Sequence, residues 1–366
     1  MRLELISNRA AFDQLVTPWE ALLAQDCTPP AGMDATSGFM WASAILDSFL
    51  SQGEWYVAIA RDSGRVAGLL PVYRPAPNRG IGSPRVLAPF TELYGGRNGF
   101  LIRQGDVNVL RRLIGCLQRE VHGWDVLQMQ LVQGSRSERM LATLAEDATI
   151  ATRTLPSLSS PILEMPDDLD EWIASMKPSF RTELRRRERR LREAGELRFD
   201  LFTDPADVPR YWEAVTTIER QSWKHTAGSS ITCRPEQDRF YRAMLPRAAE
   251  SGQWLSALLS LDGRPIAYRL SIASHGVALG LKTSFVDDLR KFSPASVLQW
   301  MYLQRVHGLG IRCFDFSGNA EDHKMQWTHA TYGLQTVQLF TPSFRGNLAR
   351  LRGGLASVAA RLRTRV

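Results

Sequence analysis

Hydrophobic and polar residues alternate over two stretches that we expect to form β-hairpins. Residues 55–74 read WYVAIARDSGRVAGLLPVYR, and residues 254–274 read WLSALLSLDGRPIAYRLSIAS. Each stretch begins with tryptophan and has a Gly-Arg pair near its centre, which starts at Gly64 in the first and at Gly263 in the second. Asp262 precedes Gly263, and an Asp-Gly pair supplies the positive φ angles that a tight hairpin turn requires. We therefore predict one antiparallel hairpin in each half of the chain.

The spacing of apolar residues changes after the second hairpin. Residues 277–285 form a short apolar run with β-branched members, typical of a strand, and residues 311–318 form another. Between them, apolar residues recur at helical spacing from Pro294, whose missing N–H costs nothing at the first helical position. Ser293 is a favoured N-cap residue, and Gly308 is placed to end the helix. We predict a strand, a helix and a second strand that runs parallel to the first.

The same order of elements follows the first hairpin, which indicates two similar units in tandem. Residues 97–103 read as a strand, and residues 107–132 read as a helix followed by a strand. Residues 155–168, rich in proline and serine, read as a connector, so we place a boundary near residue 160. The predicted fold class is α/β (α+β), with a mixed, largely antiparallel sheet flanked by helices in each unit. The predicted divisions of the chain are 1–160, 161–345 and a basic amphipathic tail, 346–366.

The N-terminal unit offers little that indicates chemistry. Its first fifty residues read as two amphipathic helices around a proline-rich break at residues 28–32, and we expect their aromatic side chains to pack in the core. Asp106 stands where the later helix begins, and its carboxylate would stabilise the helix but repel a pyrophosphate. We therefore predict no cofactor site in this unit. The polar, glycine-rich residues 91–99 could line a cleft for an acceptor or form a solvent-exposed loop.

The composition fits a globular protein with an excess of positive charge. Of the 366 residues, 44% are hydrophobic and 23% are charged, and the net charge is +7 with a pI near 9.5. Such a charge favours anionic partners, namely CoA-type cofactors, nucleic acid or an anionic membrane surface. The cysteines are scattered, and no stretch has the pattern of a signal peptide or the ~20 apolar residues of a membrane span. We expect a reduced, cytoplasmic protein.

The loop before the predicted helix at Pro294 is the strongest candidate for a ligand site. Peptide N–H groups at a helix start are unpaired, and the helix dipole favours negative charge there. Small residues at Ser293, Ala295 and Ser296 let a ligand approach the backbone, and Arg290 and Lys291 add positive charge. This combination is suited to a pyrophosphate.

Several short motifs in the second half resemble one branch of the GNAT acyltransferases, the cellulose-biosynthesis-protein-D-like acetyltransferases, which are related to Fem-type aminoacyl transferases. The stretches that carry the resemblance are Ser293-Pro294-Ala295, Asp315-Phe316-Ser317, His323-Lys324 with Trp327, residues 219–224 (ERQSWK) and residues 177–187 (KPSFRTELRRR). Three positions depart from the pattern: Ala295 replaces glycine, His323 replaces tyrosine and Ala320 replaces an acidic residue. The polar cluster of the family is therefore incomplete in this chain.

The resemblance implies transfer of an acyl group, most simply acetyl, from acyl-CoA to an amine or hydroxyl of a small-molecule or carbohydrate acceptor. It implies that the pantetheine arm lies beside Leu281, Lys282 and Thr283, and it implies a role in exopolysaccharide or cell-envelope metabolism. The candidate catalytic groups are Glu219, Asp315, His323 and Lys324, although Lys324 could instead form a buried ion pair with Asp315. The candidate substrate-binding residues are Trp223, Lys224, Lys177 and Arg181. We expect no metal, because the histidines lack the spacing of metal ligands.

Other interpretations remain open. The arginine-rich residues 177–195 predict either a solvated helix with Glu–Arg pairs or a face that binds an anion. A Fem-type transferase that uses charged tRNA is the alternative enzyme, although a nucleic-acid partner is not the first expectation because no aromatic residues interleave with the arginines. A catalytically degenerate scaffold is the third possibility. The tail 346–366 could lie on an anionic membrane surface or pack on the protein, and the sequence does not indicate an oligomeric state.

Overall fold

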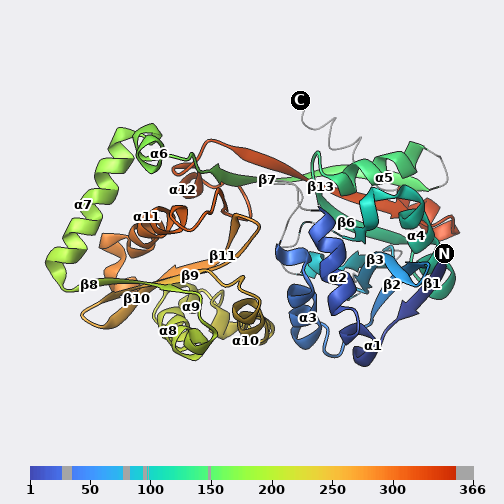
Figure 1. The fold of residues 1–366 in the computed structure, drawn as a ribbon, viewed down its shortest axis with the longest axis horizontal. Coiled ribbons are helices and arrows are strands. Elements are labelled where there is room, and N and C mark those ends of the chain that lie inside the picture. The colour runs from blue at the N-terminus through green and yellow to red at the C-terminus, as the bar shows by residue number, and fades with distance from the viewer. Residues whose placement is uncertain (27–34, 77–82, 94–96, 98, 147–149, 352–366) are drawn as a thin grey trace. The chain divides into compact units, whose positions relative to one another are not determined.

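A computed structural model describes residues 1–26, 35–76, 83–93, 97, 99–146 and 150–351 (Figure 1). Contacts divide it into an N-terminal unit, which comprises residues 1–45, 50–158 and the chain from Gly333, and a C-terminal unit, which comprises residues 46–49 and 159–332. The chain thus passes between the units four times: on either side of residues 46–49, within β7 (Ala151–Glu164) and within β13 (Thr331–Phe340). One of these crossings, between residues 158 and 159, lies close to the predicted boundary near residue 160. The chain then returns to the N-terminal unit in β13, where Leu334–Phe340 pair with β6.

The N-terminal unit has a sheet in the order β1-β2-β3-β4-β6-β13-β7. The pairs β1–β2, β2–β3, β3–β4 and β6–β13 are antiparallel, β4 and β6 run parallel, and the short β5 pairs with β3 in antiparallel fashion. The elements are β1 (Arg2–Ile6), α1 (Arg9–Asp13), α2 (Val16–Leu23), α3 (Phe39–Ser48), β2 (Trp55–Asp62), β3 (Arg65–Tyr73), β4 (Val86–Pro89), β5 (Leu101–Ile102), α4 (Val107–Glu120), β6 (Val126–Val132) and α5 (Arg136–Glu146).

The core of this unit lies between α4 and the predicted hairpin, now β2 and β3. Leu110 and Leu113 of α4 belong to one buried cluster with Ala58 of β2 and Leu70 of β3. Gly68 lets the helix approach, because a Cβ atom at this position would lie 2.6 Å from a methyl group of Val109. As predicted, Asp106 caps α4, and its carboxylate accepts a hydrogen bond from the backbone N–H of Asn108.

Three sequence predictions in this unit need correction. Residues 2–6 form a strand that pairs with β2, although the opening segment was expected to be helical. The proline- and serine-rich residues 155–168 do link the two units, but they are mostly strand β7 and not irregular chain, because neighbouring strands satisfy its backbone. The strand predicted at residues 97–103 is reduced to Leu101–Ile102. The predicted break at residues 28–32 lies outside the described residues.

The C-terminal unit has a sheet in the order β7-β12-β11-β10-β9-β8, in which β11 and β12 are parallel as predicted. The 3-10 segment η7 (Asp287–Phe292) leads from β11 into α11. The other elements are α6 (Leu169–Ser175), α7 (Pro178–Ala194), β8 (Leu197–Phe202), α8 (Val208–Arg220), α9 (Trp223–Thr226), α10 (Pro235–Glu250), β9 (Ser256–Leu261), β10 (Arg264–Ser274), β11 (Val277–Phe285), α11 (Pro294–His307), β12 (Cys313–Asp315) and α12 (Asp322–Met325).

Turn chemistry fixes the register of β9, β10 and β11. Asp262 and Gly263 have φ angles of 49° and 77°, so the predicted tight turn is confirmed. His275 and Gly276, with φ angles of 49° and 80°, make a second turn of the same kind between β10 and β11. The three strands therefore form a continuous antiparallel meander.

Helices cover both faces of this sheet (Figure 1): α7 and α11 lie on one side of β8–β10, and α8 and α10 lie on the other. Successive residues of a strand point to opposite faces. Tyr268 of β10 accordingly reaches Glu219 of α8, whereas the next residue, Arg269, lies over Phe314 of β12, whose ring packs against Tyr302 of α11. Tyr268 thus lies on the α8 face of the sheet, and Arg269 lies on the α11 face. The prediction of a mixed α/β fold with largely antiparallel sheets flanked by helices is confirmed.

Two predictions concern segments at or beyond the edges of the sheet. The basic segment forms α7 with the expected ion pairs, Glu183–Arg187 and Glu188–Arg192, each at 2.8 Å. Residues 344–351 of the tail are helical, and the rest of the tail lies outside the described residues. Within the described part of the chain, no helix combines the length and apolar character needed to cross a membrane.

Candidate functional site

The C-terminal sheet opens where β11 parts from β12. The parallel pairing ends at Leu279 and Asp315, where β12 stops, whereas β11 continues to Phe285. The pairing of β11 with β10 shifts at the same level, because Leu270 faces Lys282 while Ser271 faces Gly280, which leaves Leu281 as a bulge. The predicted pantetheine-binding residues Leu281, Lys282 and Thr283 are half-buried at this opening. A bulge beside an unpaired strand edge presents backbone groups to a ligand.

The helix α11 begins at Pro294, as predicted, but Ser293 does not cap it with its side chain. Ser293 has φ 50° and ψ 56°, the left-handed conformation, and its hydroxyl makes no capping hydrogen bond. Its carbonyl oxygen accepts from the N–H groups of Ser296 and Val297 instead. Ser293 is thus the N-cap residue, as predicted, but its side chain does not cap the helix. Ala295 and Ser296 are half-buried, so small side chains line the start of the helix.

The two cations of this loop are held only at the surface. Arg290 makes an ion pair of 2.8 Å with Asp287, and 63% of its side chain is exposed. Lys291 lies 5.0 Å from the centre of the Phe292 ring. Because exposed pairs of this kind contribute little, roughly 0–1 kcal/mol, Arg290 can exchange Asp287 for a phosphate at small cost.

Glu219 is fully buried against β10, with 0% of its surface exposed. One carboxylate oxygen accepts from the Tyr268 hydroxyl at 2.6 Å, and the other accepts from the backbone N–H of Ile231 at 2.6 Å. Burial raises the pKa of Tyr268, and the charge of Glu219 raises it further, so the phenol stays protonated and remains a donor. With both oxygens engaged, Glu219 has the environment of a structural anchor rather than of a base that contacts an acceptor.

Two lysines lie close to Glu219 on the α8 face. Lys224 donates to the carbonyl oxygen of Thr283 at 2.5 Å, and Lys282 donates to the side-chain amide oxygen of Gln237 at 3.0 Å. Burial lowers the pKa of Lys224 and lowers that of Lys282 to about 8, while the carboxylate of Glu219 opposes both shifts. The amine of Lys282 therefore titrates near neutral pH.

Asp315 and Lys324 lie near the end of β12 but do not pair. Asp315 accepts from the backbone N–H of Ser317 and from the Tyr332 hydroxyl, each at 2.8 Å. Lys324 donates to the carbonyl oxygens of Ser317 and Asn319 and lies 3.5 Å from Glu321. The predicted Lys324–Asp315 ion pair is therefore wrong. The lysine instead holds the turn after β12 by donating to the carbonyl groups of that turn.

His323 lies on α12 with 72% of its side chain exposed. Its pKa is lowered, first by partial burial and then by the charges of Lys324, Arg269 and Lys224, while Glu321 opposes the shift. The lowered pKa favours the neutral imidazole, whose lone pair can accept a proton.

The predicted substrate-binding residues lie in different places. Lys224 reaches Thr283, as described above, and Trp223 beside it is 44% exposed. Lys177 precedes α7, and Arg181 donates to the carbonyl oxygen of Ile173 at the end of α6. Arg181 therefore has a structural partner. Of the four predicted substrate-binding residues, Lys224 is the one that contacts β11 at the opening.

One residue at the opening, Arg269, was not predicted. Its side chain is 92% buried, since only 8% of the residue is exposed, and its guanidinium lies 5.4 Å from the Phe314 ring. The sequence signal for this residue was an arginine within the apolar half of a predicted hairpin. That signal did not reveal a site, because the surroundings of the arginine are formed by β11 and β12.

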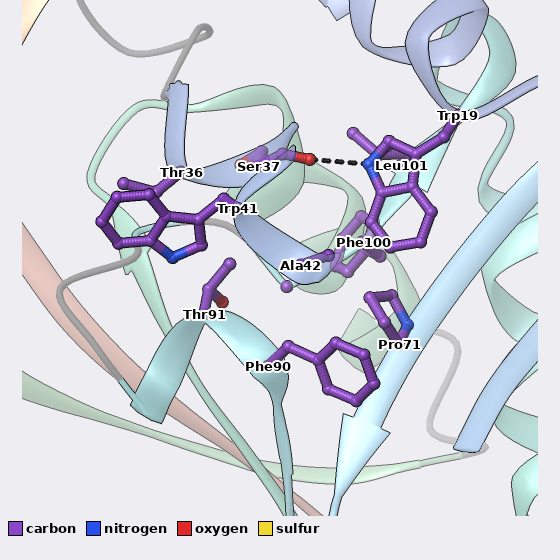
Figure 2. Close-up of a pocket in the computed structure, with 11 residues that line it drawn as sticks. Trp19, Thr36, Ser37, Trp41, Ala42, Pro71, Phe90, Thr91, Phe100 and Leu101 are labelled. Carbon is purple, nitrogen blue, oxygen red and sulfur yellow. Dashed lines mark hydrogen bonds between the residues drawn. The ribbon is translucent and has the colours of Figure 1, made fainter. Parts of the chain in front are cut away.

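The N-terminal unit contains a small apolar pocket (Figure 2). Trp41 and Trp19 lie on either side of it, and Trp19 donates through its indole N–H to the carbonyl oxygen of Ser37 at 2.8 Å. Thr91 and Gly99, the ends of the loop that was considered for an acceptor cleft, line it. The lining is mostly hydrocarbon, so it presents few groups that could orient a polar acceptor.

Residues 178–325 match the family model described as the acetyltransferase (GNAT) domain. The matched residues lie within the C-terminal unit, which is therefore similar to a GNAT-type acetyltransferase domain. No curated protein sequence matches the chain.

Solved structures similar to the chain extend the comparison to nearly its whole length. FemX superposes with a TM-score of 0.60 at 12% identity, over 95% of this chain and 99% of FemX. L-PGS from Bacillus licheniformis gives 0.53 at 12% identity, over 92% and 96%. A tandem GNAT protein from the clavulanic acid biosynthesis pathway gives 0.51 at 16% identity, over 93% and 100%. The predicted architecture of two tandem GNAT-like units is confirmed.

Proposed function

We propose that the protein transfers an acyl group from acyl-CoA to an amine or hydroxyl acceptor, with the donor bound at the opening between β11 and β12. The observation that carries the proposal is the bulge at Leu281, where β11 leaves β12 within the GNAT-type domain. In this proposal the thioester and pantetheine run along Leu281, Lys282 and Thr283. An extended strand edge can hydrogen-bond the amides of the pantetheine arm as it would a neighbouring strand.

The diphosphate of the donor is proposed to lie at the start of α11. The N-cap position has no side-chain cap, and Ala295 and Ser296 add little bulk, which supports this placement. Arg290 would leave Asp287 and bind a phosphate oxygen, which costs little because its present ion pair is exposed.

We propose His323 as the general base that accepts the proton of the acceptor. Its neutral imidazole is exposed on α12, close enough to Arg269 and Lys224 for their charges to lower its pKa. Asp315 and Lys324 would hold the turn that positions it, through Ser317. Glu219 would anchor α8 to β10. The acceptor is proposed to be a small molecule or carbohydrate, in exopolysaccharide or cell-envelope metabolism.

Calorimetric titration with CoA tests the donor site. We expect Arg290→Glu and Ser296→Trp each to weaken binding at least tenfold. Arg210→Glu is the matched control, because Arg210 pairs with Asp207 at the same three-residue spacing and is similarly exposed. CoA affinity that is equal in wild type and both loop variants would remove the donor site from α11.

The alternative is a Fem-type transferase that takes an aminoacyl group from tRNA. The relation of the cellulose-biosynthesis-protein-D-like branch to Fem-type enzymes and the superposition on FemX favour it, as does the exposed positive charge of α7. Purified protein that retains tRNA, with binding that falls steeply as salt rises, would favour this alternative over a CoA donor.

A further inference from the structure

Arg269 carries a positive charge that the described residues do not neutralise. Its backbone carbonyl oxygen accepts from the Tyr211 hydroxyl at 2.7 Å, which fixes the strand, but its guanidinium has neither an ion pair nor a hydrogen bond among the described residues. The Nε atom is buried without a partner. A guanidinium is hydrogen-bonded or paired in nearly all buried settings, since an unpaired buried charge destabilises the fold.

The nearby acids are already engaged elsewhere. Glu219 lies on the α8 face and is satisfied by Tyr268 and Ile231. Asp315 accepts from Ser317 and Tyr332. Burial lowers the pKa of Arg269 to about 10, and only tyrosines oppose that shift, which agrees with the absence of a carboxylate beside it in the described structure.

The guanidinium lies at the opening between β11 and β12. A Cβ atom at position 280 would lie 2.8 Å from Nη1 of Arg269 and 2.9 Å from Cζ of Phe314. Gly280 is the first residue of β11 beyond its last pair with β12, Leu279 with Asp315. The carbonyl oxygen of Gly280 accepts from the Ser317 hydroxyl at 2.8 Å, so the strand edge is available to a ligand only beyond this residue. The glycine therefore leaves room for Arg269 next to that point.

We propose that Arg269 binds a carboxylate of the substrate, carried by the acyl group of the donor or by the acceptor. This inference rests on the proposed function, because it places the carboxylate in the donor and acceptor cleft. The planar fork of a guanidinium matches the two oxygens of a carboxylate, and the Phe314 ring lies 5.4 Å from the guanidinium carbon. The half-buried Lys224 and Lys282 add positive potential from the α8 face.

The first arm of the test uses the donor. Wild-type protein is titrated with acetyl-CoA and with succinyl-CoA, which differ by a terminal carboxylate. If the carboxylate comes from the acyl group, succinyl-CoA binds at least tenfold tighter, and this ratio falls to about one in Arg269→Met, a variant that keeps the hydrocarbon volume but loses the charge.

The second arm uses the acceptor side, with acetyl-CoA saturating. The protein is titrated with succinate and with succinamide, which lacks the charge. A carboxylate on the acceptor is supported if only succinate binds and if its affinity falls at least tenfold in Arg269→Met. Gly280→Ala, whose Cβ would lie 2.8 Å from Nη1 of Arg269, should lower the same affinity. Arg269→Gln repeats both arms if the methionine variant does not fold.

Thermal melting without ligand separates this role from a structural one. A guanidinium held for a ligand predicts that Arg269→Met melts at the same temperature as wild type or higher. A lower melting temperature together with unchanged affinity for every carboxylate probe overturns the proposal. If CoA binds but neither arm distinguishes a carboxylate from its neutral counterpart, the carboxylate proposal is overturned and the donor site remains. If succinate binds through Arg269 but CoA does not bind, the carboxylate proposal is supported and the donor site is overturned.

Discussion

Replacement of Tyr268 by phenylalanine would test whether Glu219 is a structural anchor. The change removes one hydroxyl and leaves the buried volume nearly unchanged. It also leaves one oxygen of Glu219 without its donor in a site with no exposed surface. Hydrogen bonds to charged groups contribute roughly 1.5–3 kcal/mol, and a buried polar atom left unpaired adds its own cost. We expect a loss of about 2–3 kcal/mol in the free energy of unfolding.

Tyr302→Phe is the matched control. Tyr302 is as completely buried, but its hydroxyl donates to a neutral acceptor, the carbonyl oxygen of Leu255, at 2.9 Å. A bond of this kind contributes about 0.5–1.5 kcal/mol. Because about 1 kcal/mol shifts the midpoint of a unit of this size by roughly 2–4 °C, the two variants should melt several degrees apart.

Urea unfolding, followed by circular dichroism, measures both losses. The slope of the free energy against urea should match wild type in both variants, since neither changes the surface exposed on unfolding. Equal losses for Tyr268→Phe and Tyr302→Phe would show that the Glu219 carboxylate does not depend on Tyr268. That result would reopen Glu219 as a base able to meet an acceptor.

Two further predictions concern Lys282 and the packing of α4. Since the pKa of Lys282 is about 8 in the folded protein and about 10.4 in an unfolded chain, the folded state binds fewer protons between these values, so its stability should rise with pH through this window. We expect a gain of about 1 kcal/mol from pH 8 to 9.5 in wild type that Lys282→Met lacks, and identical urea-midpoint profiles against pH in the two proteins would refute it. In the N-terminal unit, Gly68→Ala should cost about 1–3 kcal/mol, because its new methyl would overlap Val109. Gly115→Ala on α4, where a methyl group would meet only Arg119 at 3.5 Å, should instead stabilise by about 0.5–1 kcal/mol, and urea midpoints that move together for the two glycines would contradict this account.

Features set by local chemistry could be predicted from the sequence. The turn at Asp262-Gly263 and the start of α11 at Pro294 depend on the conformations that those residues allow, so the hairpin and the helix were predicted correctly. Features set by distant partners could not. The serine and proline residues of β7 read as a connector because a single sequence does not reveal the strands that pair with it. The two hydrogen bonds that Lys324 donates to carbonyl oxygens likewise depend on the turn after β12.

The two adjacent residues Tyr268 and Arg269 show how one strand can serve the fold on one face and a ligand on the other. Tyr268 points to the α8 face and meets a carboxyl group supplied by the chain itself. Arg269 points to the α11 face and meets an aromatic ring and a glycine, but no carboxylate within the described structure. The unmatched charge lies on the same face as the open start of α11, where the donor is proposed to bind, and this coincidence makes a substrate carboxylate the simplest partner for it.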